Sequence, residues 1–151
     1  MFDAKDKKIL SCLQQDGRAS ASSIANQVGL SIPAVTERMK KLQDQGIILG
    51  YQVVISPRAI GLDVGAIITL ISDSSDHYGE VVINARKHAE VLQCFSTTGR
   101  GSHVLIVRSQ NTKSLEQLLR AIQMWPGVKR TETQLILSSY IDKLTQPLHS
   151  E

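Results

Sequence analysis

Few side chains in this 151-residue chain could perform chemistry, and their spacing assembles no catalytic site. Ser102 and His103 are a nucleophile and a base by type, but they are adjacent, with no orienting acid beside them. Neighbours on an expected strand point to opposite faces of the sheet. The turn Gly99-Arg100-Gly101 is followed by no helical pattern, so it lacks the context of a phosphate-binding loop. We therefore expect no enzymatic activity.

Cysteines and histidines indicate neither a disulfide nor a metal centre. Cys12 and Cys94 lie far apart, in stretches typical of a helix and of a strand, where we expect small buried hydrophobes. The histidines show no ligand spacing with one another or with a cysteine. They are His77, His88, His103 and His149. We therefore expect no metal and no cofactor.

Composition is that of a globular chain, with 42% hydrophobic and 21% charged residues and no low-complexity run. No stretch approaches the roughly 20 continuous apolar residues of a membrane helix, and the first residues lack the pattern of a signal peptide. We therefore expect a soluble cytoplasmic protein with no membrane partner.

Charge is distributed unevenly along the chain: residues 1–58 carry eight Lys/Arg and five Asp/Glu, whereas residues 59–151 carry nine of each. The excess positive charge indicates where a nucleic acid would bind.

Three short helices are predicted in the N-terminal third. Each follows a residue whose side chain can accept a hydrogen bond from a free first-turn N–H group, namely Asp3, Ser20 and Ser31. Glycines suited to ending a helix or forming a left-handed turn follow at Gly17, Gly29 and Gly46. Two helices joined by a short glycine-containing turn are typical of a helix-turn-helix head.

The third of these helices could read DNA. Its apolar stripe, expected to face the core, is Ile32, Val35, Met39 and Leu42. Polar and basic residues lie on or beside the opposite face, where they could reach base edges and phosphates in a major groove. We assign Pro33, Thr36, Lys40 and Gln43 to the bases, and Ser31, Arg38 and Lys41 to the phosphates. The alternative is a three-helix core whose third helix is merely solvated.

The rest of the chain predicts the element order β-α-β-β-α-β, an α+β ferredoxin-like domain. Strands are expected at 64–71, 91–97, 103–108 and 128–138, and helices at 78–85 and 115–122. The predicted divisions are a head at 1–50, a strand-like linker at 51–62 and this second domain at 63–151. An open sheet face would favour a homodimer, which would also suit a near-palindromic DNA site.

Motifs along nearly the whole chain resemble those of the leucine-responsive/asparagine (Lrp/AsnC) regulators. They include Asp16-Gly17-Arg18, Val28-Gly29-Leu30-Ser31, Gly46-Ile47-Ile48, Gly61-Leu62-Asp63-Val64, Thr98-Gly99, Pro126-Gly127-Val128 and Thr131-Glu132-Thr133. The resemblance implies a winged helix-turn-helix that binds double-stranded DNA, and a ferredoxin-like domain that binds an amino acid between neighbouring dimers. It also implies homodimers that often assemble into octamers. The implied effector residues are Gly99, Arg100, Gly101, Ser102, Thr131 and Thr133.

The chain departs from the family pattern at one place in the expected effector site. Ser102-His103 stands where many family members have an acidic residue followed by an aromatic one. The motif is most similar to the asparagine-responsive branch, which suggests asparagine or another small polar amino acid. Thr131 and Thr133 could instead be strand residues that only pack, and His103 could be satisfied by a neighbour.

Two other classes of function remain open. One is an architectural DNA-wrapping protein without an effector, and the other is a sensor or enzyme subunit whose head binds protein. Trp125 is expected to be a hydrophobic plug at a helix end rather than a stacking platform.

Overall fold

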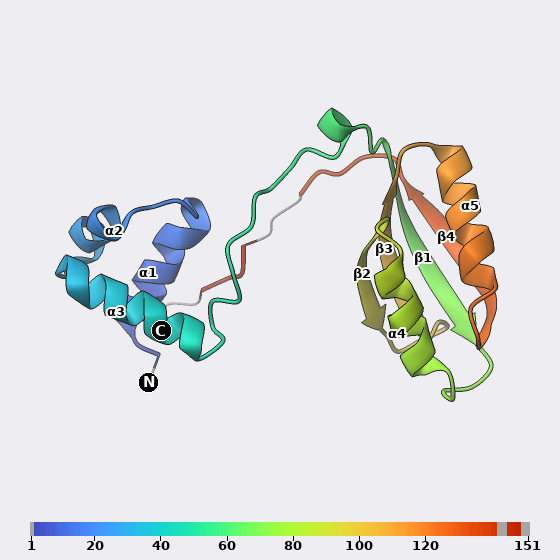
Figure 1. Cartoon of the computed structure of the whole chain (residues 1–151), viewed down its shortest axis with the longest axis horizontal. Coiled ribbons are helices and arrows are strands. Elements are labelled where there is room, and N and C mark those ends of the chain that lie inside the picture. The colour runs from blue at the N-terminus through green and yellow to red at the C-terminus, as the bar shows by residue number, and fades with distance from the viewer. Residues whose placement is uncertain (1, 142–144, 149–151) are drawn as a thin grey trace. The chain divides into compact units, whose positions relative to one another are not determined.

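The computed structural model describes residues 2–141 and 145–148, which form two compact units. One unit contains the N-terminal helices and the described C-terminal residues 145–148, and the other contains residues 55–141 (Figure 1). Within the described part of the chain, no helix has the length and hydropathy needed to cross a membrane.

The N-terminal unit consists of α1 (Ala4–Gln15), α2 (Ala21–Val28) and α3 (Ile32–Asp44). The predicted caps are confirmed, because the side chains of Asp3, Ser20 and Ser31 accept hydrogen bonds from Asp6, Ser23 and Ala34. Gly29 has φ 67°, the left-handed conformation that the tight turn between α2 and α3 requires. These local interactions account for the agreement between the predicted and the observed helices.

The core of this head contains Ile9, Ile24, Val35 and Leu42. Leu148, which the sequence division assigned to the second domain, packs against the same cluster. Ile32 does not join the core as we expected; it is 49% exposed. At 100° per residue it lies about 80° around α3 from Leu42, at the margin of the apolar stripe.

An ion-pair cluster joins the start of α1 to α3. Arg38 Nη1 donates to Asp3 Oδ2 at 2.7 Å and to Asp6 Oδ1 at 2.8 Å. Asp6 is buried, with 6% of its surface exposed. The backbone N–H of Asp6 and then Arg38 lower the pKa of the Asp3 carboxyl, and hydrogen bonds to the two carboxylates raise the pKa of Arg38. A buried carboxylate is tolerated only with such partners.

The second unit is a four-stranded antiparallel sheet of order β2-β3-β1-β4. Its strands are β1 (Val64–Ser72), β2 (Val91–Ser96), β3 (His103–Ser109) and β4 (Val128–Ile136). The helices α4 (Tyr78–Lys87) and α5 (Thr112–Gln123) cover one face (Figure 1). The predicted α+β order is therefore confirmed.

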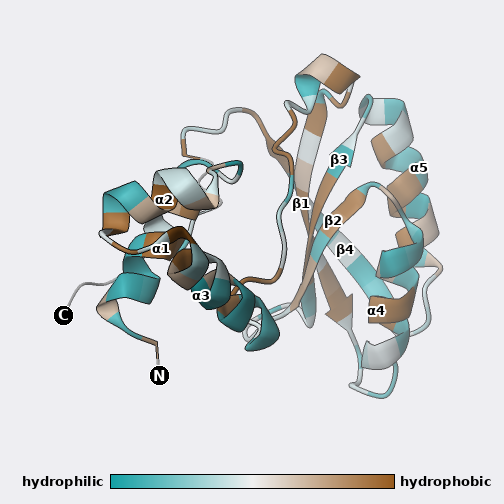
Figure 2. Ribbon diagram, turned by 60° about the vertical axis from the view of Figure 1, so that its left-hand side comes forward, coloured by the Kyte–Doolittle hydropathy of each residue, from teal (hydrophilic) through white to brown (hydrophobic). Residues whose placement is uncertain are grey.

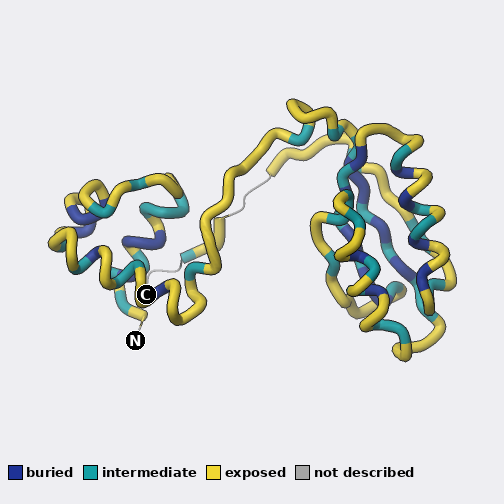
Figure 3. Tube along the Cα trace, in the orientation of Figure 1, coloured by how far each residue is buried: buried dark blue, intermediate teal, exposed yellow. Residues whose placement is uncertain are grey.

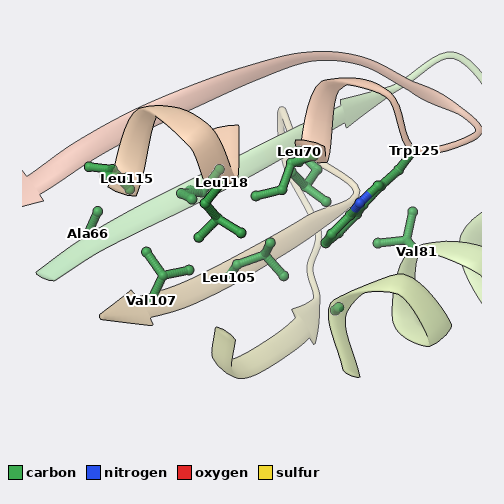
Figure 4. Packing of buried hydrophobic residues seen from close by; sticks show 11 residues of the cluster. Ala66, Leu70, Val81, Leu105, Val107, Leu115, Leu118 and Trp125 are labelled. Atoms are coloured by element: carbon green, nitrogen blue, oxygen red, sulfur yellow. The ribbon is translucent and has the colours of Figure 1, made fainter. Parts of the chain in front are cut away.

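Residues from both helices and the central strands form the core of this unit. Trp125 is 7% exposed and lies among Leu70, Leu105 and Val81 (Figure 4). It follows the end of α5, as expected of a hydrophobic plug, and its ring lies 5.6 Å from that of His88. Cys12 and Cys94 are both unbridged and half-buried.

The linker forms no strand, although its apolar residues led us to expect a strand-like segment. Only the short 3-10 helix η1 (Arg58–Ile60) occurs between α3 and β1. Hydrophobic segments of the linker (Figure 2) are exposed (Figure 3), with Val53 and Val54 at 85% and 74%. A strand needs a partner backbone, and none of the described residues supplies one.

Removal of the Arg38 charge should destabilise the N-terminal unit in a pH-dependent way. The low pKa of Asp3 contributes stability at pH values above its ordinary 3.8, and this stability is lost as pH falls through the folded-state value. Arg38→Met should therefore lower the unfolding temperature at neutral pH, and the deficit should shrink as acid protonates the Asp3 carboxylate.

Circular dichroism melts from pH 7 to pH 3 would measure this deficit. Lys40→Met is the matched control, because it removes a charge from the same helix at a position where the described residues form no ion pair. An Arg38→Met deficit that is constant with pH, or one shared by the control, would contradict the assignment.

Candidate nucleic-acid interface and effector site

The turn between α2 and α3 is fixed by contacts at both of its ends. Lys5 Nζ donates to the carbonyl of Val28, the last residue of α2, where a cation also complements the helix dipole. On the other side, Ser31 Oγ accepts a hydrogen bond from the backbone N–H of Ala34, at 3.3 Å, at the start of α3. The two helices are thereby joined through a turn of defined geometry.

One face of α3 presents polar side chains to solvent. Pro33, Thr36, Lys40 and Gln43 are all exposed. At 100° per residue they fall within a sector of about 80°. Thr36 Oγ1 donates to the carbonyl of Ile32 at 3.0 Å, which leaves the hydroxyl oxygen able to accept. Hydroxyl, amide and ammonium groups thus gather where a major groove could receive them.

The residues that we assigned to phosphates are placed differently. Lys41 is exposed but lies about 80° around α3 from Pro33, outside the sector of the base-contacting candidates. Ser31 acts as the helix cap, and Arg38 is paired with Asp3 and Asp6. The partners of Arg38 are 32 and 35 residues away in sequence, and only the acidic residues at the start of α1 could have suggested them.

The candidate effector turn connects β2 to β3. Gly99 has φ 103°, a conformation that few residues other than glycine adopt. The backbone N–H of Thr97 donates to the carbonyl of Ser102 at 3.1 Å, and that of Ser102 donates to the carbonyl of Leu70 at 2.8 Å. These bonds attach the turn to the end of β1.

Ser102 and His103 are buried rather than open to a ligand. Ser102 Oγ lies 2.9 Å from Ser72 Oγ, 3.3 Å from the carbonyl of Leu70 and 3.0 Å from His103 Nδ1. His103 is 2% exposed, and its ring meets the ring of Tyr78 edge-on at 4.8 Å. Burial lowers the pKa of His103, so its neutral form is favoured. This agrees with a histidine whose hydrogen-bonding capacity is met by its neighbour Ser102.

The remaining effector candidates lie on two sides of the sheet. Thr131 and Thr133 pair with Leu70 and Ile68, so their side chains are on the face that α4 and α5 cover. Glu132 pairs with Thr69 and has the opposite orientation. There it meets the exposed Arg100, with Arg100 Nη2 and Glu132 Oε1 at 3.4 Å.

The six effector candidates line neither of two cavities formed by the described residues. A cavity of about 230 Å³ between α4 and β2 is lined by Val82, Ala85, Arg86, Val91, Leu92, Gln93 and Cys94. Another of about 260 Å³ lies between α1 and the described C-terminal residues. Neither is lined by Gly99, Arg100, Gly101, Ser102, Thr131 or Thr133.

Comparison with known families identifies both units. Residues 2–48 match the family described as winged helix-turn-helix DNA-binding, and residues 65–145 match the Lrp/AsnC ligand binding domain. The chain belongs to the Lrp/AsnC family. It is a DNA-binding transcription regulator of the Lrp/AsnC type, with an N-terminal winged helix-turn-helix and a C-terminal amino-acid-binding domain.

Individual Lrp/AsnC relatives extend over almost the whole chain. The HTH-type transcriptional regulator FL11 of Pyrococcus horikoshii is 33% identical over 147 residues, which are 97% of each protein. A transcriptional regulator of Neisseria meningitidis in complex with L-Met has a TM-score of 0.92 and 27% identity, and the match covers 98% of this chain and 97% of that one. The structure of Escherichia coli AsnC has a TM-score of 0.90 and 29% identity, and the match covers 97% and 99% of the two chains.

Replacement of Gly101 should disrupt the turn, because no room exists for a side chain there. A Cβ atom on Gly101 would lie 2.3 Å from Thr69 Cγ2 and 3.0 Å from the carbonyl oxygen of Leu70. Gly101→Ala should therefore lower the free energy of unfolding by about 1–3 kcal/mol, the usual cost of overpacking.

Urea unfolding of the full chain would measure the effect. Gly79→Ala is the control, since a Cβ atom there meets nothing within 4 Å and Gly79 is in α4, where alanine is the better helix former. Equal stability of Gly101→Ala and the native chain would show that the turn can move away from β1.

Proposed function

We propose that α3 enters the major groove and that Pro33, Thr36, Lys40 and Gln43 contact base edges. The observation that carries this proposal is the gathering of these exposed side chains in one sector of α3. Glutamine pairs well with adenine N6 and N7, lysine with guanine O6 and N7, and a hydroxyl with either purine. A helix-turn-helix places the N-terminal part of its second helix against the bases, which is the position of Pro33 and Thr36.

Contacts to phosphates are proposed for Lys41, Ser31 and Arg38. Lys41 is exposed about 80° around α3 from Pro33, outside the base-contacting sector, and its ammonium group can neutralise a flanking phosphate there. Ser31 stands at the N-terminus of α3, where a hydroxyl proton and free N–H groups can bind an anion. Arg38 has N–H groups beyond the nitrogen that binds Asp3 and Asp6, and these would have to reach a phosphate without loss of the ion pairs.

A homodimer is proposed to cover the open face of the sheet. Ile67, Ile71, Val104 and Ile106 alternate with the buried core residues of β1 and β3, so they lie on the face without helices. The exposed hydrophobic linker offers a second unpaired surface of the same chain. Two heads of one dimer would contact two half-sites of a near-palindrome, and further association of dimers, up to an octamer, would extend the bound DNA.

A small amino acid is proposed as the effector, bound between copies of the chain. Gly99, Arg100, Gly101 and Ser102 supply a turn that lets a ligand approach the backbone, and Thr131 and Thr133 supply hydroxyl groups. These groups line neither of the two cavities described above, and we propose that a second copy completes the site. Because Arg100 and the threonines lie on opposite sides of the sheet, Arg100 of one copy would bind the carboxylate and the threonine hydroxyls of another copy would bond an amide. This chemistry favours asparagine or another small polar amino acid, whereas the Neisseria relative was solved with L-Met.

The burial of Ser102 and His103 favours a second candidate function. Where the family pattern led us to expect a carboxylate, the chain has Ser102, which is 7% exposed and whose hydroxyl is engaged inside the fold. An effector's ammonium group would therefore lack an obvious anionic partner from this turn. An architectural protein that wraps DNA without an effector is the alternative.

The DNA assignments can be separated by two substitutions. Lys41→Ala should weaken binding to all sequences alike and reduce the slope of log K against log salt by about one. Gln43→Ala should cost about 1–3 kcal/mol at its own base pair and relax the preference there.

Fluorescence anisotropy titrations on specific and scrambled duplexes at several salt concentrations would measure both effects. Lys113→Ala, which removes an exposed lysine of the second unit, is the control and should change neither. A loss for Gln43→Ala that is equal on every duplex would contradict the assignment of Gln43 to base contacts.

The effector proposal is tested by thermal shift against the twenty amino acids. A ligand that binds only the folded chain stabilises it by RT ln(1 + [L]/Kd), about 2.7 kcal/mol at a hundredfold excess over Kd. Thr133→Ala should reduce the shift, and Lys113→Ala, at an exposed position of α5 outside the candidate site, should leave it intact. A screen without any shift would favour the architectural alternative.

A further inference from the structure

One apolar side chain stands outside the core on the helix that is proposed to contact bases. Ile32 is 49% exposed and belongs to neither the buried cluster of the head nor the residues packed against it. Among the described residues of α1, α2 and α3, it is the one large hydrophobic side chain that is exposed. Neither the packing of the head nor the caps of its helices explain an isoleucine at this position.

The location of Ile32 relates it to the base-contacting sector. At 100° per residue, Ile32 lies about 20° from Gln43 and about 40° from Thr36 around α3. Ile32 and Thr36 are also neighbours along the helix, one turn apart, and Thr36 Oγ1 donates to the Ile32 carbonyl. Ile32 is the first residue of α3, at the end that a helix-turn-helix directs at the base edges.

The chemistry of the major groove provides one apolar partner for such a side chain. Thymine presents a C5-methyl group there, and the other three bases present hydrogen-bonding groups without a methyl. A β-branched isoleucine in a helix has one dominant χ1 rotamer, so its ordering on DNA costs little entropy. The ring of Pro33 follows it in the chain and extends the exposed apolar surface.

We propose that Ile32 is a specificity-determining residue that packs on the C5-methyl group of a thymine in each half-site. This inference rests on the proposed contact of α3 with bases and adds an apolar contact to the polar ones of Thr36, Lys40 and Gln43. Its consequence is a preference for thymine over every other base, including uracil, at one position of the half-site. Uracil differs from thymine only by the missing methyl group, so it isolates this contact from hydrogen bonding.

Uracil scanning of a duplex that the protein selects from a random pool would test the inference. Each thymine is replaced in turn by uracil, and Kd is measured for the native chain and for Ile32→Ala. The native chain should lose about fourfold in affinity at one thymine of each half-site, the factor that corresponds to about 0.8 kcal/mol for one buried methyl group. Ile32→Ala should bind the thymine and uracil duplexes equally well, and its unfolding temperature should match that of the native chain because Ile32 is outside the core.

Ile47→Ala is the matched control. Ile47 is 41% exposed and follows α3, so its replacement should leave the uracil effect unchanged. The inference is overturned if Ile32→Ala keeps the full uracil effect, or if the native chain selects a sequence but tolerates uracil at every position. If the native chain binds all duplexes alike, the proposed base contacts of α3 fail as well. The two failures are therefore distinguishable.

Discussion

The ion pair between Arg38 and the buried Asp6 is the constraint on which the DNA-binding head depends. It joins α3 to the first turn of α1 by a contact at 2.8 Å, with Asp3 as a second acceptor at 2.7 Å. Arg38 lies roughly opposite the sector of Thr36, Lys40 and Gln43 around the helix. A charged contact on the side of α3 away from that sector therefore resists rotation of α3 about its own axis.

Local chemistry explains why the sequence predicted the elements well. The caps at Asp3, Ser20 and Ser31 and the left-handed Gly29 need only residues within a few positions, so they can be recognised without a structure. The burial of Ile32 was predicted incorrectly, because a position on the apolar face of a helix does not determine where the core ends. The partners of Arg38 were missed because they lie 32 and 35 residues away. The linker shows the same limit, since its apolar pattern is compatible with a strand but contains no partner for one.

The effector candidates show how strand register decides what a motif can do. The turn at Gly99 to Ser102 lies near the strand ends, as expected, but pairing of Thr131 with Leu70 turns that hydroxyl to the helix-covered face. Glu132, between the two threonines, faces the other way and meets Arg100. A shift of one residue in the pairing would exchange these orientations. The sequence of one chain does not contain the hydrogen bonds that set the register, so the side of each residue could not be predicted.

An effector site that needs a second copy has a thermodynamic consequence. Binding of the amino acid would then stabilise the assembled form over the separate chains, and assembly would raise the affinity for the amino acid by the same factor. The open face of the sheet and the exposed linker are the surfaces that assembly could cover, and they consist of other residues than the exposed sector of α3. The effector would act on DNA by changing how many heads are held together, and it would not need to alter the contacts of any single head.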